Sequence, residues 1–512
     1  MVAAVLVGAC APAPVRRIPA VLYASGADLQ SINPLVGTHP LARQIQNHVL
    51  FMTLAAYDSS FAAHPRLAAD WRWSDARRTL TIRLRPDVRW HDSTPTTATD
   101  VAWTLNMARD PRVAYPRARD LSNIVGVEVV DSLQVRIRFD RPTVFPDVLT
   151  DLAILPARYF AGVAPEEIRT HAFNRHPVGN GPYRFVAYQP NQRWVFARWD
   201  AFPADLGPAR LDRFVVVVVD ESATKLAALT SGELDVAGIN PAHADFVRAD
   251  PRLEVVEYPL LFPVALVWNL RRAPFDDIRV RRALTRAIDR RTLVDAYVYG
   301  FGTVAHGPVS PAHPWYVPVD SEPYDPLSAG RLLDQAGWRR GADGVRVRDG
   351  RRLAFDLLAV TSGDNPLEQL IQAQLAGIGV AVRIRVRELS AFLDAAQGAA
   401  RTYDALVVGV PGDLSLGYVA AMYGSPEGPL AYPGYRNPAF DAAVREARQS
   451  IDADAVAAAW ARVQRILAAD LPTTWLYHAR GVQGRNRRLR APVPDLRGEL
   501  AGMAHWTLED RP

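Results

Sequence analysis

A strand–helix–strand pattern that occurs in each half of the chain constrains the fold most strongly. Val215 to Val219 is an unbroken β-branched run, which is typical of a strand buried on both faces of a parallel sheet. A helical stretch at 222–229 and a second strand at 234–239 follow it. The second copy of the pattern comprises residues 353–360, 367–378 and 380–387. Two such units predict an α/β protein with two lobes.

A different pattern, the alternation of apolar and polar residues, dominates the region between residues 55 and 177. One alternating pair of runs lies at 71–84 around a Ser-Asp turn, and a second lies at 125–139 around an Asp-Ser turn. Each pair predicts a β-hairpin. We therefore expect residues 55–177 to form an antiparallel, separately packed unit.

Length and composition agree with several packed units. At 512 residues the chain is too long for one hydrophobic core. Its 49% hydrophobic and 22% charged residues are ordinary for a globular protein and argue against a disordered scaffold. The net charge of +5 does not indicate a nucleic-acid partner, because basic residues are interleaved with acidic ones. No apolar run reaches the roughly 18 to 20 residues that a membrane-spanning helix needs.

The only cysteine, Cys10, ends an apolar N-terminal run, so a disulfide within the chain is excluded. Val7-Gly8-Ala9-Cys10 resembles a lipobox, in which the cysteine carries lipid after a signal peptide is removed. No Lys or Arg precedes Cys10, although a signal peptide usually begins with one. The alternative is a chance cysteine in a frayed tail. We expect residues 1–19 to be a signal and lipoprotein tether.

Sequence motifs for catalysis are missing. The chain has no G-x-S-x-G elbow, no H-E-x-x-H helix and no phosphate-binding loop. His91-Asp92, and His171 with His176, come nearest to metal-ligand spacing, but each lies in a predicted loop, where a structural or solvated histidine explains it. We therefore expect no enzyme, no metal and no cofactor.

Seven segments, in order along most of the chain, resemble motifs of the bacterial extracellular solute-binding proteins of family 5, the oligopeptide-, dipeptide- and nickel-binding components of ABC transporters. The segments are Leu84–Leu105, Pro177–Tyr183, Leu229–Val236, Trp268-Asn269 with Pro274-Phe275, Val280–Arg290, Tyr324–Trp338 and Tyr435–Asp441. Each alone is a weak signal, but their common order makes the resemblance specific.

The first of these segments has a structural explanation in its own residues. Thr94-Pro95 fixes a turn, and Thr97 with Asp100 forms a capping box that opens a helix. The family usually has Gly where this chain has Ser93. A turn that needs a positive φ would be strained there.

The resemblance implies the two-lobed clamp of periplasmic binding proteins, with an extra antiparallel subdomain inserted in the first lobe. The implied division is residues 20–54, 178–264 and 482–512 for the first lobe, 55–177 for the inserted subdomain, and 265–481 for the second lobe. Strands near Val264–Asn269 and Tyr477–Val482 are expected to form the hinge on which the lobes close over a solute.

Candidate ligand contacts follow from the expected hinge and loops. Trp268 and Asn269 would give the cleft an aromatic wall and an amide; the alternative for Trp268 is a place in the core. Thr361 and Ser362, in the loop after the strand that ends at Val360, are expected to face the cleft.

The strongest single candidate is Asp413. Peptide-binding members of the family carry a Gly-Trp-x-x-Asp stretch whose Asp pairs with the α-amine of the ligand, since a buried ammonium needs a carboxylate partner. The matching stretch here, Gly409 to Asp413, keeps the Asp and lacks the Trp. The alternative is a plain loop aspartate. For a ligand carboxylate, Arg387 and Arg401 are both open candidates, although the arginine face of the strand at 380–387 is expected to be solvated.

The resemblance implies an extracytoplasmic, monomeric binding protein that delivers a di- or oligopeptide to ABC permease subunits with a cytoplasmic ATPase. Its expected location is the periplasm or the outer face of the cytoplasmic membrane, with the lipid on Cys10 as anchor. One alternative is a non-peptide solute, such as a nickel chelate, an opine or a glycoside, on the same scaffold. Further alternatives are a secreted hydrolase and a signalling receptor subunit.

Overall fold

The computed structural model describes residues 19–509, except 38, 145, 361–364, 399, 425–427 and 429. The lipidation candidate Cys10 and the loop candidates Thr361 and Ser362 lie outside the described residues.

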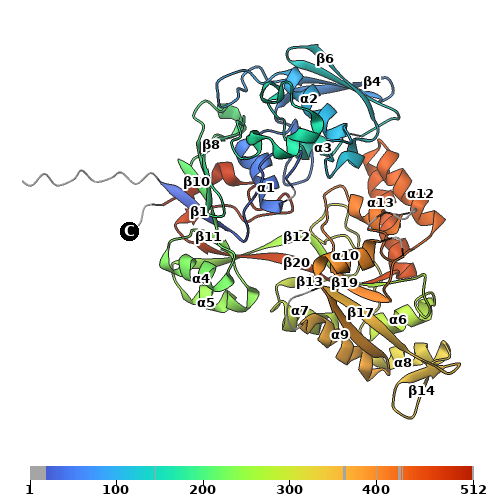
Figure 1. Cartoon of the computed structure of the whole chain (residues 1–512). Coiled ribbons are helices and arrows are strands. Elements are labelled where there is room, and N and C mark those ends of the chain that lie inside the picture. Colours follow the sequence, from blue (N-terminus) through green and yellow to red (C-terminus); the bar gives the residue numbers. More distant parts are fainter. Residues whose placement is uncertain are drawn as a thin grey trace, which may run out of the picture.

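One large mixed sheet runs through both lobes, in the order β18-β17-β19-β12-β20-β11-β1-β10-β9-β8, with β13 paired to β20 (Figure 1). Strands β8 to β11 and β1 belong to the first lobe, whereas β17, β18 and β19 belong to the second. The bounds are β1 Ala20–Ser25, β8 Tyr183–Gln189, β9 Arg193–Arg198, β10 Arg213–Val218, β11 Val236–Gly238, β12 Leu253–Trp268, β13 Gly302–Val304, β17 Ala354–Val360, β18 Ala381–Arg387, β19 Ala405–Gly409 and β20 Thr473–Asn486. Two long strands, β12 and β20, connect the lobes.

The first-lobe sheet confirms the predicted α/β unit and corrects one detail. Strand β1 pairs in parallel with both β10 and β11, and α4 (Ser222–Ser231) connects the latter two. On its other side β10 pairs with β9 in the antiparallel sense. In β10, Val216 is buried while Val215 and Val217 are half-buried, so the predicted burial of this run on both faces is wrong.

The inserted subdomain is a four-stranded antiparallel sheet with a helix packed on it, as the two predicted hairpins require. Its strand order is β4-β5-β7-β6. The elements are β4 Ala68–Ser74, β5 Thr79–Leu84, β6 Ile124–Asp131, β7 Gln134–Phe139, α2 Ala98–Arg109 and α3 Val148–Asp151.

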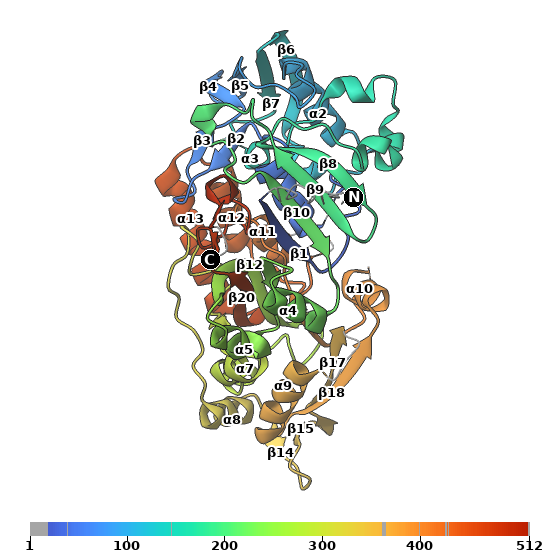
Figure 2. The same ribbon diagram turned by 90° about the vertical axis from the view of Figure 1, so that its left-hand side faces the viewer.

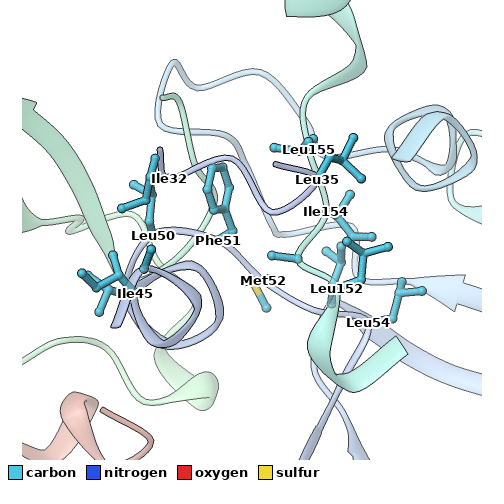
Figure 3. Close-up of a cluster of buried hydrophobic side chains, with 14 of the residues drawn as sticks. Ile32, Leu35, Ile45, Leu50, Phe51, Met52, Leu54, Leu152, Ile154 and Leu155 are labelled. Atoms are coloured by element: carbon cyan, nitrogen blue, oxygen red, sulfur yellow. The ribbon is translucent and has the colours of Figure 1, made fainter. Parts of the chain in front are cut away.

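The expectation that this subdomain packs separately is wrong. A single hydrophobic core joins it to the rest of the first lobe. Figure 3 shows the junction, where Leu35 of the first lobe lies beside Leu155 of the insert, and Phe51 lies between them and Ile32. Helix α1 (Pro40–Ile45) supplies part of this junction and continues as a π-helical turn, Gln46–Leu50. Helices α4 and α5 (Ala244–Ala249) cover the other face of the first-lobe sheet.

The second lobe has helices on both faces of its sheet, which gives two hydrophobic cores. One face carries α6 Ile278–Arg286, α7 Arg290–Tyr297, α8 Pro326–Gln335 and α9 Pro366–Gly377. The other carries α10 Leu389–Gln397, α11 Gly417–Tyr423, α12 Pro438–Gln449 and α13 Ala453–Asp470. The parallel pairing of β17 with β18 through α9 confirms the second predicted unit.

Most family motifs are helix caps and turns in the structure. Asp277 and Asp289 cap α6 and α7, and Asp325 and Asn437 cap α8 and α12, each by accepting backbone N–H bonds. In the Pro177–Tyr183 motif, a Cβ on Gly179 would lie 1.9 Å from the carbonyl oxygen of Leu50. These motif residues therefore fix helix ends and turns of the fold.

The hinge lies slightly earlier in β12 than the sequence predicted. Leu253 packs in a first-lobe cluster and Val264 in a second-lobe core, so this strand crosses between the lobes within 254–263. Its pairing with β20 shifts register between Pro259 and Pro263. The predicted crossing at 477–482 agrees with the structure, because Tyr477 packs in the second lobe and Val482 in the first.

The predicted strain at Ser93 is confirmed. This residue has φ +72°, in the left-handed region that favours glycine, and it is exposed. Replacing Ser93 with Gly removes the Cβ clash of the folded state, which is stabilising, and adds freedom to the unfolded chain, which is a smaller destabilising effect. We therefore expect S93G to raise the free energy of unfolding by about 0.5–1 kcal/mol. Urea titration of the variant beside S60G, a serine-to-glycine control in another exposed loop, checks this. An unfolding midpoint at or below the wild-type value would contradict it.

Candidate ligand site between the lobes

Asp413 lies in the loop between β19 and α11, and its carboxylate is held by the start of that helix. It accepts backbone N–H bonds from Gly417 at 3.0 Å and Tyr418 at 3.2 Å, and the hydroxyl of Ser415 donates to it. The residue is half-buried. Its position is therefore fixed before any ligand arrives.

The same loop touches the first lobe through His313. The Nε2 of His313 lies 3.0 Å from the carbonyl oxygen of Leu414, while its Nδ1 accepts the backbone N–H of Trp315 at 3.1 Å. Nε2 must then carry the proton, and burial lowers the pKa of His313. The ring stacks on Phe61 at 6.1 Å between centroids. Phe61 lies at the tip of a first-lobe hairpin formed by β2 (Ala55–Tyr57) and β3 (Ala63–Pro65), so the two lobes meet beside Asp413.

The first-lobe side of this contact holds a compensated network of charges. Arg117 contacts Asp120 at 2.7 Å and also pairs with Asp151, which in turn binds Arg43. Asn47, from the π-helical turn, donates to Asp151 at 2.9 Å. Two arginines and two aspartates balance each other here.

Asp147 stands apart from that balance. It immediately precedes α3, is half-buried, and accepts a hydrogen bond from the hydroxyl of Tyr57. Burial raises the pKa of Asp147 to about 6, and the negative charge of Asp413 contributes to the rise. Figures 1 and 2 both place α3 on the side of the first lobe that faces α12 and α13 of the second.

Trp268 does not line this interface, contrary to the prediction. Its side chain is fully buried, stacks on Phe275 at 5.2 Å between centroids, and meets Phe355 edge-on. The indole N–H donates to the hydroxyl of Thr474 at 3.1 Å. Side chains alternate along a strand, and Trp268 points into the helix-covered core.

Asn269 and Arg401 are likewise structural. The Asn269 amide, 1% exposed, donates to the carbonyl oxygens of Tyr403 at 2.8 Å and Arg401 at 3.2 Å. The Arg401 guanidinium, also buried, donates to the carbonyl oxygens of Ala396 and Gly428. Contrary to the prediction, neither side chain is available to a ligand.

The arginine face of β18 is solvent-facing, as predicted. Arg383 and Arg385 both contact Asp356 on the neighbouring strand, at 2.6 Å and 3.2 Å, and Arg387 is exposed.

Two of the histidines singled out in the sequence, His91 and His171, have structural roles. His91 bridges Gly179 and Gly181, and burial lowers its pKa to about 4. The Nδ1 of His171 accepts the backbone N–H of Phe173. Among the described residues there is no group of three or more His, Cys, Asp or Glu side chains that could hold a metal ion. Within the same residues, no helix is both long and apolar enough to span a membrane.

Three carboxylates of interest were missed from the sequence. Asp147 and Asp151 are four residues apart in the otherwise apolar stretch FPDVLTDLAIL, and this spacing is the signal that could have revealed them. Glu499 accepts from Gln483 at 2.8 Å and from the hydroxyl of Tyr23, and burial raises its pKa to about 7. No sequence pattern marks Glu499.

Two α/β lobes connected by a pair of crossing strands, one lobe with an inserted antiparallel sheet, define the hinged, two-lobed class of solute-binding proteins. The chain belongs to the bacterial extracellular solute-binding proteins, family 5, whose middle segment matches residues 62–432.

Relatives and solved structures agree with this membership. Protein XP55 of Streptomyces lividans is 30% identical over 453 residues, which cover 84% of this chain and 79% of that protein. The oligopeptide-binding protein AppA of Bacillus subtilis is 25% identical over 93% of this chain and 89% of its own.

In structure, the AppA complex with a nonapeptide superposes with a TM-score of 0.79 at 23% identity, over 96% of this chain and 99% of that chain. NikZ of Campylobacter jejuni, solved with Ni(L-His), gives 0.78 at 22% identity over the same fractions. These two likenesses establish the fold.

Proposed function

We propose that the protein is the extracytoplasmic binding component of an ABC importer, that it binds a di- or oligopeptide by closing its lobes, and that it delivers the peptide to permease subunits driven by a cytoplasmic ATPase. Closure is a population shift, effective to the extent that the peptide binds the closed form better than the open one. Family membership supports the transport role, and the peptide-binding relative AppA supports the ligand class.

The observation that carries the ligand proposal is the carboxylate of Asp413. It is fixed by two backbone N–H groups at the contact between the lobes, and no Arg, Lys or His among the described residues forms an ion pair with it. A half-buried carboxylate of this kind provides the counter-charge that the α-ammonium of a peptide needs on leaving water. Asp413 is thus the proposed anchor of the peptide N-terminus.

Attachment to the membrane through a lipid on Cys10 belongs to the same proposal. It rests on the lipobox-like residues Val7 to Cys10 and on the extracellular location typical of the family. The binding unit acts as a monomer in this proposal, because the interface for the ligand lies between the two lobes of one chain.

A thermal-shift screen tests the ligand class, since a compound that binds only the folded protein raises its unfolding midpoint. The compounds are a dipeptide, a tripeptide, a nonapeptide, each with a free N-terminus, a nickel–histidine complex and a disaccharide. We expect at least one peptide to raise the midpoint at a concentration where the disaccharide does not. A shift with nickel–histidine alone would replace the peptide by a metal chelate, and hydrolysis of any peptide would overturn the binding-protein assignment.

A further inference from the structure

We propose that Asp147 is the first-lobe counterpart of Asp413, so that the two carboxylates, one from each lobe, enclose the cationic group of the ligand when the lobes close. This proposal rests on the proposed function, which identifies the cationic group as the ammonium of a peptide. A second consequence concerns the empty protein and does not depend on the ligand class.

A short chain of contacts connects the two carboxylates. Asp147 accepts from the hydroxyl of Tyr57, which ends β2. The tip of the same β2–β3 hairpin carries Phe61, which stacks on His313 of the second lobe. His313 is hydrogen-bonded to Leu414, the residue after Asp413. The β2–β3 hairpin, which holds Asp147 through Tyr57, thus meets the loop between β19 and α11 that carries Asp413.

A second contact between the lobes flanks the first. A Cβ placed on Gly428 of the second lobe would lie 3.8 Å from Nη1 of Arg119 of the first lobe. Arg119 and Asp120 both lie in the 3₁₀ turn Ala118–Leu121, and Arg117 is the N-cap of this turn. The first-lobe surface that approaches the second lobe therefore includes this turn and the β2–β3 hairpin, whose Tyr57 holds Asp147 at the start of α3.

The charges around Asp147 leave it negative. The titratable groups that act on it are Tyr57 from β2, Arg117 and Asp120 from the 3₁₀ turn and its N-cap, and Asp413 from the opposite lobe. Arg117 is already compensated by Asp120 and Asp151. Among the described residues, neither Asp147 nor Asp413 forms an ion pair.

Asp147 and Asp413 lie on opposite lobes and repel each other, and the repulsion grows as closure brings them together and removes water. A cationic group placed between them reverses the sign of this energy. Closure of the empty protein is then penalised and closure around a cation is favoured, which couples the hinge to the charge of the ligand. The coupling is present when Asp147 is ionised, above pH about 6, and is lost as the pH falls through that value.

The first experiment measures closure without any ligand. Dyes are attached through V129C on the inserted subdomain and Y324C on the second lobe, both exposed positions, in a chain whose Cys10 is replaced by serine. Energy transfer is measured at pH 8 in this background and with D147N, D413N, both together, or D200N. The amide oxygen introduced by D147N can still accept from Tyr57, and Asp200 is an exposed first-lobe aspartate whose side chain is 83% accessible.

We expect D147N and D413N each to increase the closed fraction of the ligand-free protein several-fold, the double variant to add little to either, and D200N to change nothing. Lowering the pH of the unsubstituted background from 8 to 5 should reproduce the effect of D147N. Equal closed fractions in D147N, D413N and the unsubstituted background would overturn the proposal, as would effects of the two substitutions that simply add.

The second experiment measures the dissociation constant of a free-amine peptide and of its N-acetylated form by calorimetry. We expect D147N to weaken the free-amine peptide about tenfold and to leave the acetylated peptide unweakened. Equal weakening of both peptides would assign Asp147 a structural role and contradict the proposal. If the wild-type protein bound neither peptide, the proposed function would fail. The ligand-free closure measurement would still decide whether Asp147 controls closure through its charge or is only structural.

Discussion

Replacing Asp413 with Asn is expected to weaken peptide binding by about 100-fold, because it removes the counter-charge of a desolvated ammonium while leaving the ammonium buried. Gly417 and Tyr418 donate to different carboxylate oxygens, so the new amide oxygen can keep one of these two hydrogen bonds and the other is lost. Calorimetric titration with the peptide that gives the largest thermal shift measures the loss.

Ser415 offers the matched control for this variant. Its hydroxyl donates to Asp413, so S415A removes one hydrogen bond and keeps the charge. We expect S415A to cost less than about tenfold in affinity. If D413N lost no more affinity than S415A, Asp413 would be a loop-capping residue and the proposed anchor would be wrong.

Replacing Trp268 with Ala is expected to lower the free energy of unfolding by about 3–5 kcal/mol, through a large cavity in the second-lobe core. The indole is fully buried between Phe275 and Phe355, and its loss also leaves the hydroxyl of Thr474 without one donor. Urea titration followed by circular dichroism measures the change.

The same variant separates the core position from a ligand-binding one. W268F keeps an aromatic ring in the stack and should recover more than half of the lost stability. Peptide affinity of folded W268A should stay close to wild type, since Trp268 has no exposed surface in the structure. A large loss of peptide affinity with little loss of stability would show that Trp268 contacts the ligand, as the sequence predicted.

The strands, hairpins and helices were predictable because periodicity and caps are local signals. Val135 and Ile137 alternate in β7 as expected, and Asp277 caps α6 as expected. The shared core of the inserted subdomain was not predictable in the same way. It depends on the packing of residues such as Phe51 and Leu152, far apart in the chain, into one core, which no local pattern records.

The candidate site was predictable only where the family resemblance carried a residue into a loop. Asp413 was proposed in this way, and it lies where the lobes meet. Trp268 and Asn269 were placed by their closeness to the hinge along the chain, but the crossing occurs earlier in β12, and both side chains serve the second lobe. Asp147 was missed because its importance comes from the opposite lobe.

Small-angle X-ray scattering of the protein, alone and with increasing peptide, tests the hinged binding of a peptide most directly. We predict that the radius of gyration decreases on adding the best peptide of the thermal screen and reaches its limit at one peptide per chain, and that D413N needs a far higher concentration for the same decrease. A peptide that saturates the protein while its radius of gyration stays unchanged would contradict closure of the two lobes around the ligand.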